Sequence, residues 1–377
     1  MAMTHRQRAV AAIKGQKPDR IPFIGRMDLW YAYNHNRGTL PEKYNGWSLW
    51  DIQRDLGIGI FGFGAWSASF YKLRPKGFEV RHSSTPTEQV TEYVTPYGTL
   101  RSRNVLADEI KDADVTGAQV EHHFKDESDY DALEFLFEHT EVVENYDEYA
   151  KVIDSIGEDG LALPYSGWLP MHQIMREYMG YETFYFQIHD HPEKVERLHD
   201  ALLEQQRAII RLAAHCPAEV IEVGGNYEEM ITPPSIFKSY FAPFYRESAD
   251  VLHAGGKLMA AHCDGDMDRL LPLIGDCGLD VAEAITPRPM TSVDIRTTRA
   301  LWGDRITMWG GIPTILLTST FSDDEFEENM VNLFRAVAPG DRFILGFGDN
   351  APTDALSSRI ERTAHLYEEY GGYPISV

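Results

Sequence analysis

A histidine and an aspartate stand two residues apart at the end of an apolar run. Residues 257–261 can form a buried strand, and His262, Cys263 and Asp264 follow it directly. On an extended backbone His262 and Asp264 face one side, and Cys263 faces the other. A parallel α/β protein builds reactive sites from such strand ends. A lone histidine could equally close a helix cap or bond a buried carbonyl, so the neighbouring strands decide between these interpretations.

Other apolar runs along the chain also end in polar or aromatic side chains. If the strands are parallel, their carboxyl ends meet at one mouth, and these side chains converge there. The expected set is, in chain order, Arg26, Asp28, Tyr165, Trp168, Glu222, Asn226, His262, Asp264, Glu283, Trp309 and Asp349.

One histidine among several carboxylates could support two kinds of chemistry. Imidazole nitrogen and carboxylate oxygen are suitable zinc ligands. The same groups could work as a general acid and base pair. Taken singly, each carboxylate also has a structural interpretation: Glu222 could pair with an arginine, and Asp349 could cap a helix near residue 354. As a set, they favour a functional mouth.

The positions of these residues depend on an alternation of strands and helices along most of the chain. The expected strands are 21–24, 57–64, 161–165, 219–223, 257–261, 279–282, 306–310 and 342–346. The expected helices are 4–14, 47–56, 184–214, 235–254, 267–276, 292–302 and 323–338. Strands that are mostly followed by helices predict parallel pairing through right-handed crossovers. We therefore predict an α/β fold, a single (β/α)8 TIM barrel.

The helix at 323–338 has the clearest pattern. Ser322 and Glu325 have the spacing of a capping box, and Pro339-Gly340 provides a stop. The apolar stripe comprises Phe326, Met330, Leu333, Phe334 and Val337.

Residues 66–159 interrupt the alternation. Residues 88–103 alternate around a Pro-Tyr-Gly turn, which predicts a β-hairpin. Residues 107–159 are acidic and partly helical in pattern. We expect 66–159 to be an accessory insertion, a hairpin and helical elaboration over or beside the mouth, within one domain that spans 1–377.

Composition narrows the range of functions and partners that the chain can have. The 377 residues carry a formal charge of −23, which disfavours nucleic acid and anionic membranes as partners. The three cysteines, Cys216, Cys263 and Cys277, form neither a disulfide framework nor a zinc-knuckle spacing. With no apolar run near 18 residues and no leader pattern, we expect a cytoplasmic protein.

Several segments, in this order and spacing, resemble the uroporphyrinogen decarboxylase superfamily over nearly the whole chain. They are residues 6–22, 95–100, 221–226, 262–266, 309–313 and 345–352. The resemblance implies a (β/α)8 barrel, and a homodimer would match the family.

The motifs separate two branches of that superfamily. True uroporphyrinogen decarboxylases carry an Arg-Gln-Ala-Gly-Arg loop and a Gly-His-Gly, where this chain has residues 25–28 (Gly-Arg-Met-Asp) and 346–348 (Gly-Phe-Gly). Only Arg26 remains as a carboxylate clamp. Several zinc-dependent methyltransferases of corrinoid systems use His-x-Cys on the fifth strand and a later Cys. Here Asp264 replaces the first Cys, and Phe347 stands in place of the second.

The resemblance implies an oxygen-rich zinc site, similar to that suggested for members acting on methyl ethers. Its ligands would be Glu222, His262 and Glu283, with Asp264 in reserve. The implied activity is methyl transfer between a small methylated substrate, such as a methyl ether, and the cobalamin of a partner corrinoid protein. The remaining mouth residues divide into catalytic candidates, Asp28, Tyr165 and Asp349, and substrate-binding candidates, Arg26, Trp168, Asn226 and Trp309.

Two alternatives stay open at this point. A cofactor-free decarboxylase or lyase would anchor a small carboxylate on Arg26 and use Asp28 or Asp349 as proton donor. A non-catalytic barrel would only bind a ligand.

Overall fold

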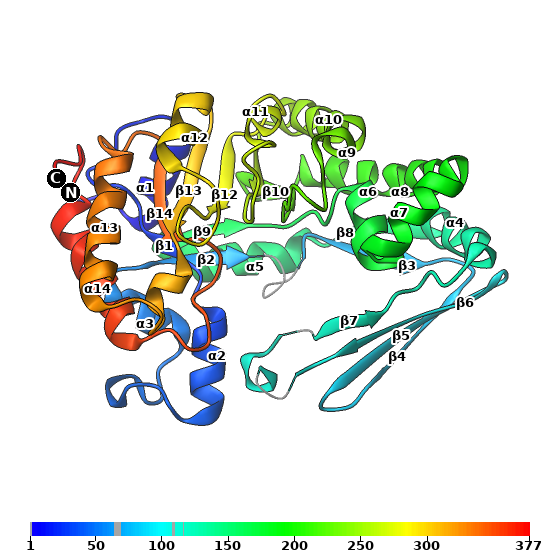
Figure 1. Cartoon of the computed structure of the whole chain (residues 1–377), viewed down its shortest axis with the longest axis horizontal. Coiled ribbons are helices and arrows are strands. Elements are labelled where there is room, and N and C mark those ends of the chain that lie inside the picture. The colour runs from blue at the N-terminus through cyan, green and yellow to red at the C-terminus, as the bar shows by residue number, and fades with distance from the viewer. Residues whose placement is uncertain (1, 64–68, 108–109, 116) are drawn as a thin grey trace.

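The computed structural model describes residues 2–63, 69–107, 110–115 and 117–377. It has the mixed α/β architecture predicted from the sequence (Figure 1). A three-stranded parallel sheet has the order β1-β2-β9, and a five-stranded parallel sheet has the order β10 to β14. The strands are β1 Ile24–Gly25, β2 Gly59–Phe63, β9 Gly160–Leu163, β10 Val220–Gly225, β11 Leu258–His262, β12 Val281–Ile285, β13 Thr307–Ile312 and β14 Phe343–Phe347.

Isolated parallel bridges join the two sheets at both seams. Tyr165 pairs with Glu222 between β9 and β10, and Phe23 pairs with Leu345 between β1 and β14. Pro22 and Pro164 stand beside these bridges and accept hydrogen bonds through their carbonyls. Because proline has no N–H to donate, regular pairing cannot run through either seam. Among the described residues, the two parallel sheets are therefore joined by isolated bridges, one at the β9–β10 seam and two at the β1–β14 seam, where Arg26 also pairs with Asn350.

A compact apolar cluster draws residues from every one of these strands. Its strand members are Ile24, Phe61, Leu161, Leu163, Val220, Leu258, Ala260, Val281, Trp309 and Ile344. Ala9, Ala12 and Ile13 of helix α1 (His5–Ile13) pack against it. Inward side chains that meet in this way fill the interior of a ring of parallel strands. The carboxyl ends of the strands are left to carry polar groups.

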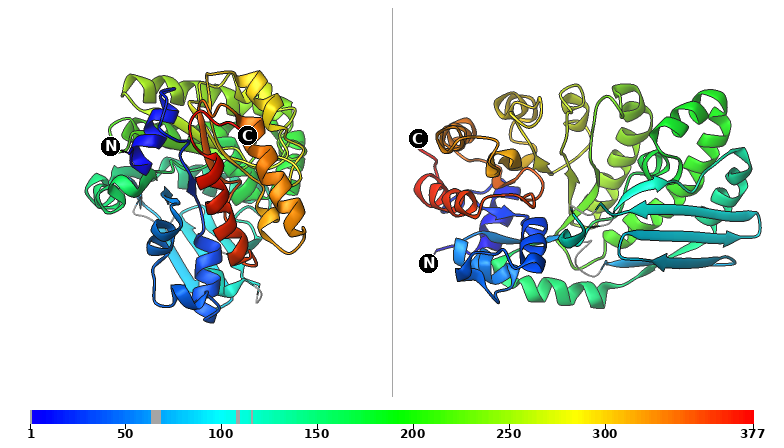
Figure 2. Two further views of the ribbon diagram at one scale, coloured as in Figure 1. Left: turned by 90° about the vertical axis from the view of Figure 1, so that its left-hand side faces the viewer. Right: turned by 60° about the horizontal axis from the view of Figure 1, so that its bottom comes forward.

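Helices cover the outside of the strands (Figures 1 and 2). They include α2 Asp28–Arg37, α3 Leu49–Leu56, α5 Tyr146–Ile156, α6 Pro170–Gln173, α7 Tyr181–Asp190, α8 Pro192–Ala213, α9 Pro234–Ile236, α10 Ala242–Ala254, α11 Leu271–Ile274, α12 Ile295–Trp302, α13 Asp323–Val337 and α14 Ser357–Tyr370. The helix expected at 184–214 is two helices, because α7 ends at Asp190 and Pro192 begins α8 after a single intervening residue, His191. Two short π-helices, Ile174–Met179 and Phe237–Phe241, lie against α6 and α10.

An antiparallel sheet, β4 to β7, occupies the end of the molecule opposite the two termini (Figures 1 and 2). Its strands are β4 Glu79–Ser84, β5 Glu88–Thr95, β6 Gly98–Val105 and β7 Ala118–Glu121. The predicted hairpin is confirmed as β5 and β6, which turn between Thr95 and Gly98. Strands β3 Tyr71–Pro75 and β8 Thr140–Glu144 form a second antiparallel pair, followed along the chain by α5, which packs on β2 and β9. Residues 66–68 of the expected insertion lie outside the described residues.

Candidate metal centre and active site

Three neighbouring strands bring Glu222, His262 and Glu283 together. His262 ends β11 and pairs in register with Glu283 of β12. Glu222 lies in β10, whose pairing with β11 shifts between Glu222 and Gly225. This irregularity at the strand end is typical of functional sites, because it re-aims side chains.

Gly225 makes this arrangement possible. Its φ is +143°, and a Cβ atom there would lie 2.4 Å from His262 Cβ and 2.6 Å from His262 O. The next residue, Asn226, has a φ of +55°, and its N–H donates to the His262 carbonyl at 2.9 Å. Only a residue without a side chain at 225 lets β10 approach β11 so closely.

The distances within the cluster fit shared ligation or shared protons. His262 Nδ1 lies 2.5 Å from Glu283 Oε2 and 3.7 Å from Glu222 Oε1. One ligand atom from each residue falls within 4.8 Å of the others. Glu222 is 0% exposed, and neither of its carboxylate oxygens has a hydrogen-bond partner among the described residues. A buried carboxylate without partners costs free energy unless a proton or a cation satisfies it.

The electrostatics follow from this burial. Burial, and then the charge of Glu283, raise the pKa of Glu222 well above its ordinary value. Burial lowers the pKa of His262, but the carboxylates of Glu283 and Asp264 outweigh it and raise that pKa well above its ordinary value. The cluster therefore retains protons that a bound cation would replace.

The other face of His262 meets a second pair of carboxylates. His262 Nε2 lies 3.7 Å from Asp264 Oδ2 and 3.8 Å from Asp349 Oδ1. Asp349 also accepts a hydrogen bond from Arg26 Nη1 at 2.8 Å. Its side chain is 44% exposed, so this side of the cluster opens toward solvent.

Asp28 stands near this ion pair but outside the histidine cluster. It is the first residue of α2, and burial raises its pKa while Arg26 acts against that rise. Asn350 Nδ2 lies 3.5 Å from Asp28 Oδ2. Asn350 is 5% exposed and was missed by sequence reasoning, although it directly follows Asp349.

Tyr165 and Trp168 lie beside the glutamates rather than against His262. Tyr165 pairs through its backbone with Glu222, and its ring packs edge-on against Trp168 with centroids 5.8 Å apart. Both side chains line a cavity of about 560 Å³.

Trp309 lies away from the mouth. Strand β13 continues to Ile312, two residues beyond its expected end, which leaves Trp309 within the interior apolar cluster. Its indole N–H donates to the Ile24 carbonyl at 3.0 Å, and its ring packs against Phe61. The structure therefore does not bring Trp309 together with the histidine cluster.

The group formed by Glu222, His262 and Glu283 fits a zinc ion in its chemistry. It supplies one imidazole nitrogen and two carboxylate oxygens, which are donor types that zinc binds. The unpartnered oxygens of Glu222 fit a missing cation. Asp264 Oδ1 is also buried without a hydrogen-bond partner in the part of the chain that the structure describes, and Asp264 stands close enough to His262 to join or support such a site.

Comparison with known proteins agrees with this fold. Residues 109–370, more than half of the chain, match the uroporphyrinogen decarboxylase (URO-D) family, and the chain belongs to this family. A solved methyltransferase from Methanosarcina mazei aligns with a TM-score of 0.56 at 12% identity, over 98% of this chain and 99% of its own. That likeness concerns the fold. A search of curated proteins gives no match.

Proposed function

We propose that this protein is the methyltransferase component of a corrinoid system. It would move a methyl group between a small methylated substrate, such as a methyl ether, and the cobalamin of a partner corrinoid protein. The observation that carries the proposal is the buried Glu222–His262–Glu283 group, whose donor atoms converge within 4.8 Å. The fold shared with a methyltransferase supports it.

Each residue of the proposed site has a role in this reaction. Glu222, His262 and Glu283 would hold zinc, with Asp264 in reserve; bound zinc supplies Lewis acidity toward the oxygen or sulfur that loses the methyl group. Tyr165 and Trp168 would line the substrate site, and Asn226 would contact the substrate beside them. Asp349 and Asp28 would hold or move protons at the open side of the mouth.

The pairing of Arg26 bears on the decarboxylase alternative. A carboxylate clamp needs an arginine that is free to meet the substrate, but Arg26 already binds Asp349 at 2.8 Å. A substrate carboxylate would have to displace Asp349. We therefore place Arg26 as a residue that positions Asp349 within the mouth.

The described residues include no helix that is long and apolar enough to cross a membrane. We propose a cytoplasmic location, where a corrinoid partner would dock at the mouth. A homodimer is the assembly that we propose to test by light scattering.

Zinc binding provides the direct test. Chelator-stripped protein should bind about one zinc per chain in calorimetry. His262→Ala should weaken binding by more than roughly 100-fold, since even outer-shell losses cost about 10–100-fold. Exposed His215→Ala is the matched control and should leave the affinity unchanged.

Glu222→Gln gives a second variant that keeps the side-chain shape, and it too should lose zinc. Equal zinc binding by wild type, His262→Ala and Glu222→Gln would contradict the ligand set. Methyl transfer to a corrinoid protein, measured by the cobalamin absorbance spectrum, then tests the reaction itself.

A further inference from the structure

The cavity beside Tyr165 has walls that are rich in aromatic rings. Its volume is about 560 Å³. Rings come from β3, β5, the loop before β4, the loop after β9 and the π-helix at 174–179: Tyr71, Phe78, Tyr93, Tyr165, Trp168 and Tyr178. Such rings present electron-rich faces, which attract a positive charge.

Among the described residues that line the cavity, Glu177 supplies a carboxylate and His82 an imidazole, and none is a lysine or an arginine. Gln173 Nε2 donates to Glu177 Oε2 at 2.9 Å, and among the described residues no lysine or arginine forms an ion pair with Glu177. The neighbouring Arg176 instead stacks over the Trp168 ring, 4.4 Å from its centroid.

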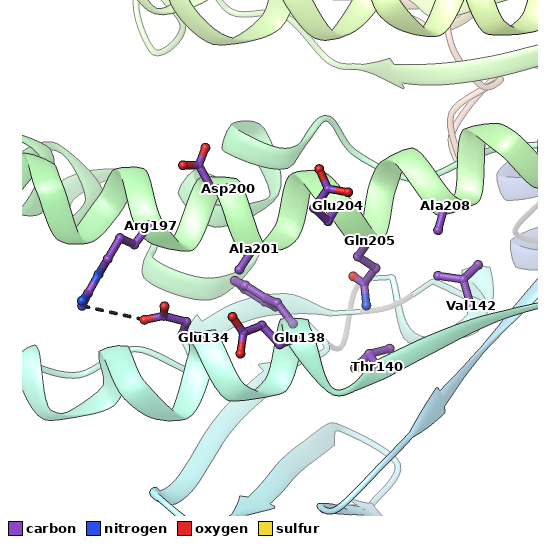
Figure 3. A pocket seen from close by; sticks show the side chains of 11 residues that line it. Glu134, Glu138, Thr140, Val142, Arg197, Asp200, Ala201, Glu204, Gln205 and Ala208 are labelled. Carbon is purple, nitrogen blue, oxygen red and sulfur yellow. Dashed lines mark ion pairs between the residues drawn. The ribbon is translucent and has the colours of Figure 1, made fainter.

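An acidic groove adjoins this cavity between α4 (Tyr130–Glu138) and α8 (Figure 3). Glu134, Glu138, Asp200 and Glu204 line it together with Arg197. Glu134 lies 3.7 Å from Arg197, and Glu204 pairs with Arg207 at 2.6 Å. Phe137, Thr140 and Gln205 line both the groove and the cavity, so the two spaces share a wall. Four carboxylates against one arginine leave the groove with an excess of negative charge, which favours ligands of the opposite sign.

We propose that the aromatic cavity binds a small organic cation that carries a methylated ammonium group. The ring faces would contact the methyl groups, and the Glu177 carboxylate would balance the charge. A cation with an apolar surface fits these walls because it loses less hydration than a bare ammonium or metal ion on entry. Anions are disfavoured by Glu177 and by the acidic groove. This proposal rests on the cavity alone and does not depend on zinc or on methyl transfer.

Calorimetry with choline and its uncharged isostere, 3,3-dimethylbutan-1-ol, tests the proposal. The two probes have the same shape, so their affinity ratio reports the charge. Wild-type protein should bind choline at least roughly tenfold more tightly than the alcohol. Glu177→Gln should weaken choline binding roughly tenfold and leave the alcohol unchanged.

Two further variants complete the design. Phe78→Leu keeps an apolar wall but removes a ring face. It should therefore weaken the binding of choline and leave the affinity for the alcohol unchanged. Glu182→Gln removes the same charge from an exposed site outside the cavity and should change neither affinity. Retained binding of the alcohol shows that the variants remain folded. The proposal is overturned if wild type binds choline no better than the alcohol, binds neither, or keeps its choline affinity in Glu177→Gln.

Discussion

His262, Glu222 and Glu283 meet where almost no solvent reaches, with exposures of 7%, 0% and 2%. Charges so placed interact far more strongly than at the surface, so their protonation is coupled. The contact of 2.5 Å between His262 Nδ1 and Glu283 Oε2 leaves room for one shared proton. Zinc would take the place of that proton, because a metal ligand must be deprotonated. The same residues thus hold the shared proton without metal and would be the ligands of the proposed metal site.

His172 gives a pH-dependent prediction at the same scale. It is 1% exposed, stacks on Phe241, and burial lowers its pKa to about 3. The unfolded chain has the higher pKa for this group and takes up a proton as the pH falls below about 6.5. The contribution of His172 to the free energy of unfolding is therefore fully present above that pH and is lost as the pH falls toward 3. This histidine should lower the free energy of unfolding by about 2 kcal/mol between pH 8 and pH 5.

Urea unfolding at the two pH values checks this expectation. His172→Phe keeps a packed ring but cannot be protonated, so its loss of stability on acidification should be smaller by that amount. Exposed His215→Gln serves as the control. An equal loss in wild type and His172→Phe would contradict the prediction.

At the scale of elements, the end of strand β10 decides how the site is built. The register shift after Glu222 and the close approach at Gly225 bring two strands against each other. Local sequence explains this through the Gly224-Gly225 pair, which permits backbone angles that other residues avoid.

Gly225→Ala should therefore damage both stability and zinc binding. Backbone strain at its φ of +143° costs on the order of 1–3 kcal/mol. The clash with His262 should add about 1–3 kcal/mol, as overpacking does in cores. Thermal unfolding and zinc calorimetry measure the two effects.

Gly98→Ala is the matched control for this substitution. Gly98 has a similar φ of +141°, but a Cβ atom there would meet nothing within 4 Å. It should show the strain alone and leave zinc affinity intact. If both variants lose the same stability, the close approach at Gly225 contributes nothing.

At the scale of the whole molecule, we predict that the insertion at 66–159 forms a single domain with the rest of the chain. Phe124 illustrates the basis for it: the side chain is 3% exposed, and its N–H donates to the Tyr178 carbonyl outside the interval at 2.8 Å. Phe124 belongs to a second, larger apolar cluster that also contains Ile60, Ile221 and Met259 of the core strands. An insertion tied in this way should unfold together with the rest.

Phe124→Ala tests this cooperativity. Loss of a buried ring costs about 3–5 kcal/mol. All tryptophans except Trp66 lie outside 66–159, so tryptophan fluorescence reports unfolding of the remainder. The variant should lower the stability measured by fluorescence by that amount, whereas Val120→Ala, at a position 52% exposed, should have little effect. If fluorescence gives the same stability for Phe124→Ala as for wild type, 66–159 is a separate domain.

Local sequence alone determined much of the fold. All eight expected strands appear within a few residues of their predicted positions, because apolar runs and turn residues act locally. Helix α13 has the predicted capping box, since Ser322 and Glu325 are three residues apart and need no distant partner. Parallel strand order then implied that Glu222, His262 and Glu283 would be neighbours.

Tertiary structure decided the details that depend on distant partners. Arg26 and Asp349 are 323 residues apart and meet only because the first and last strands are adjacent. Trp309 lies in the interior because β13 extends two residues further than its sequence indicates, and one strand's length is set by pairing with its neighbours. The aromatic cavity likewise joins rings from segments that sequence alone does not connect. Periodicity specifies which residues form an element, whereas packing between elements specifies which side chains meet.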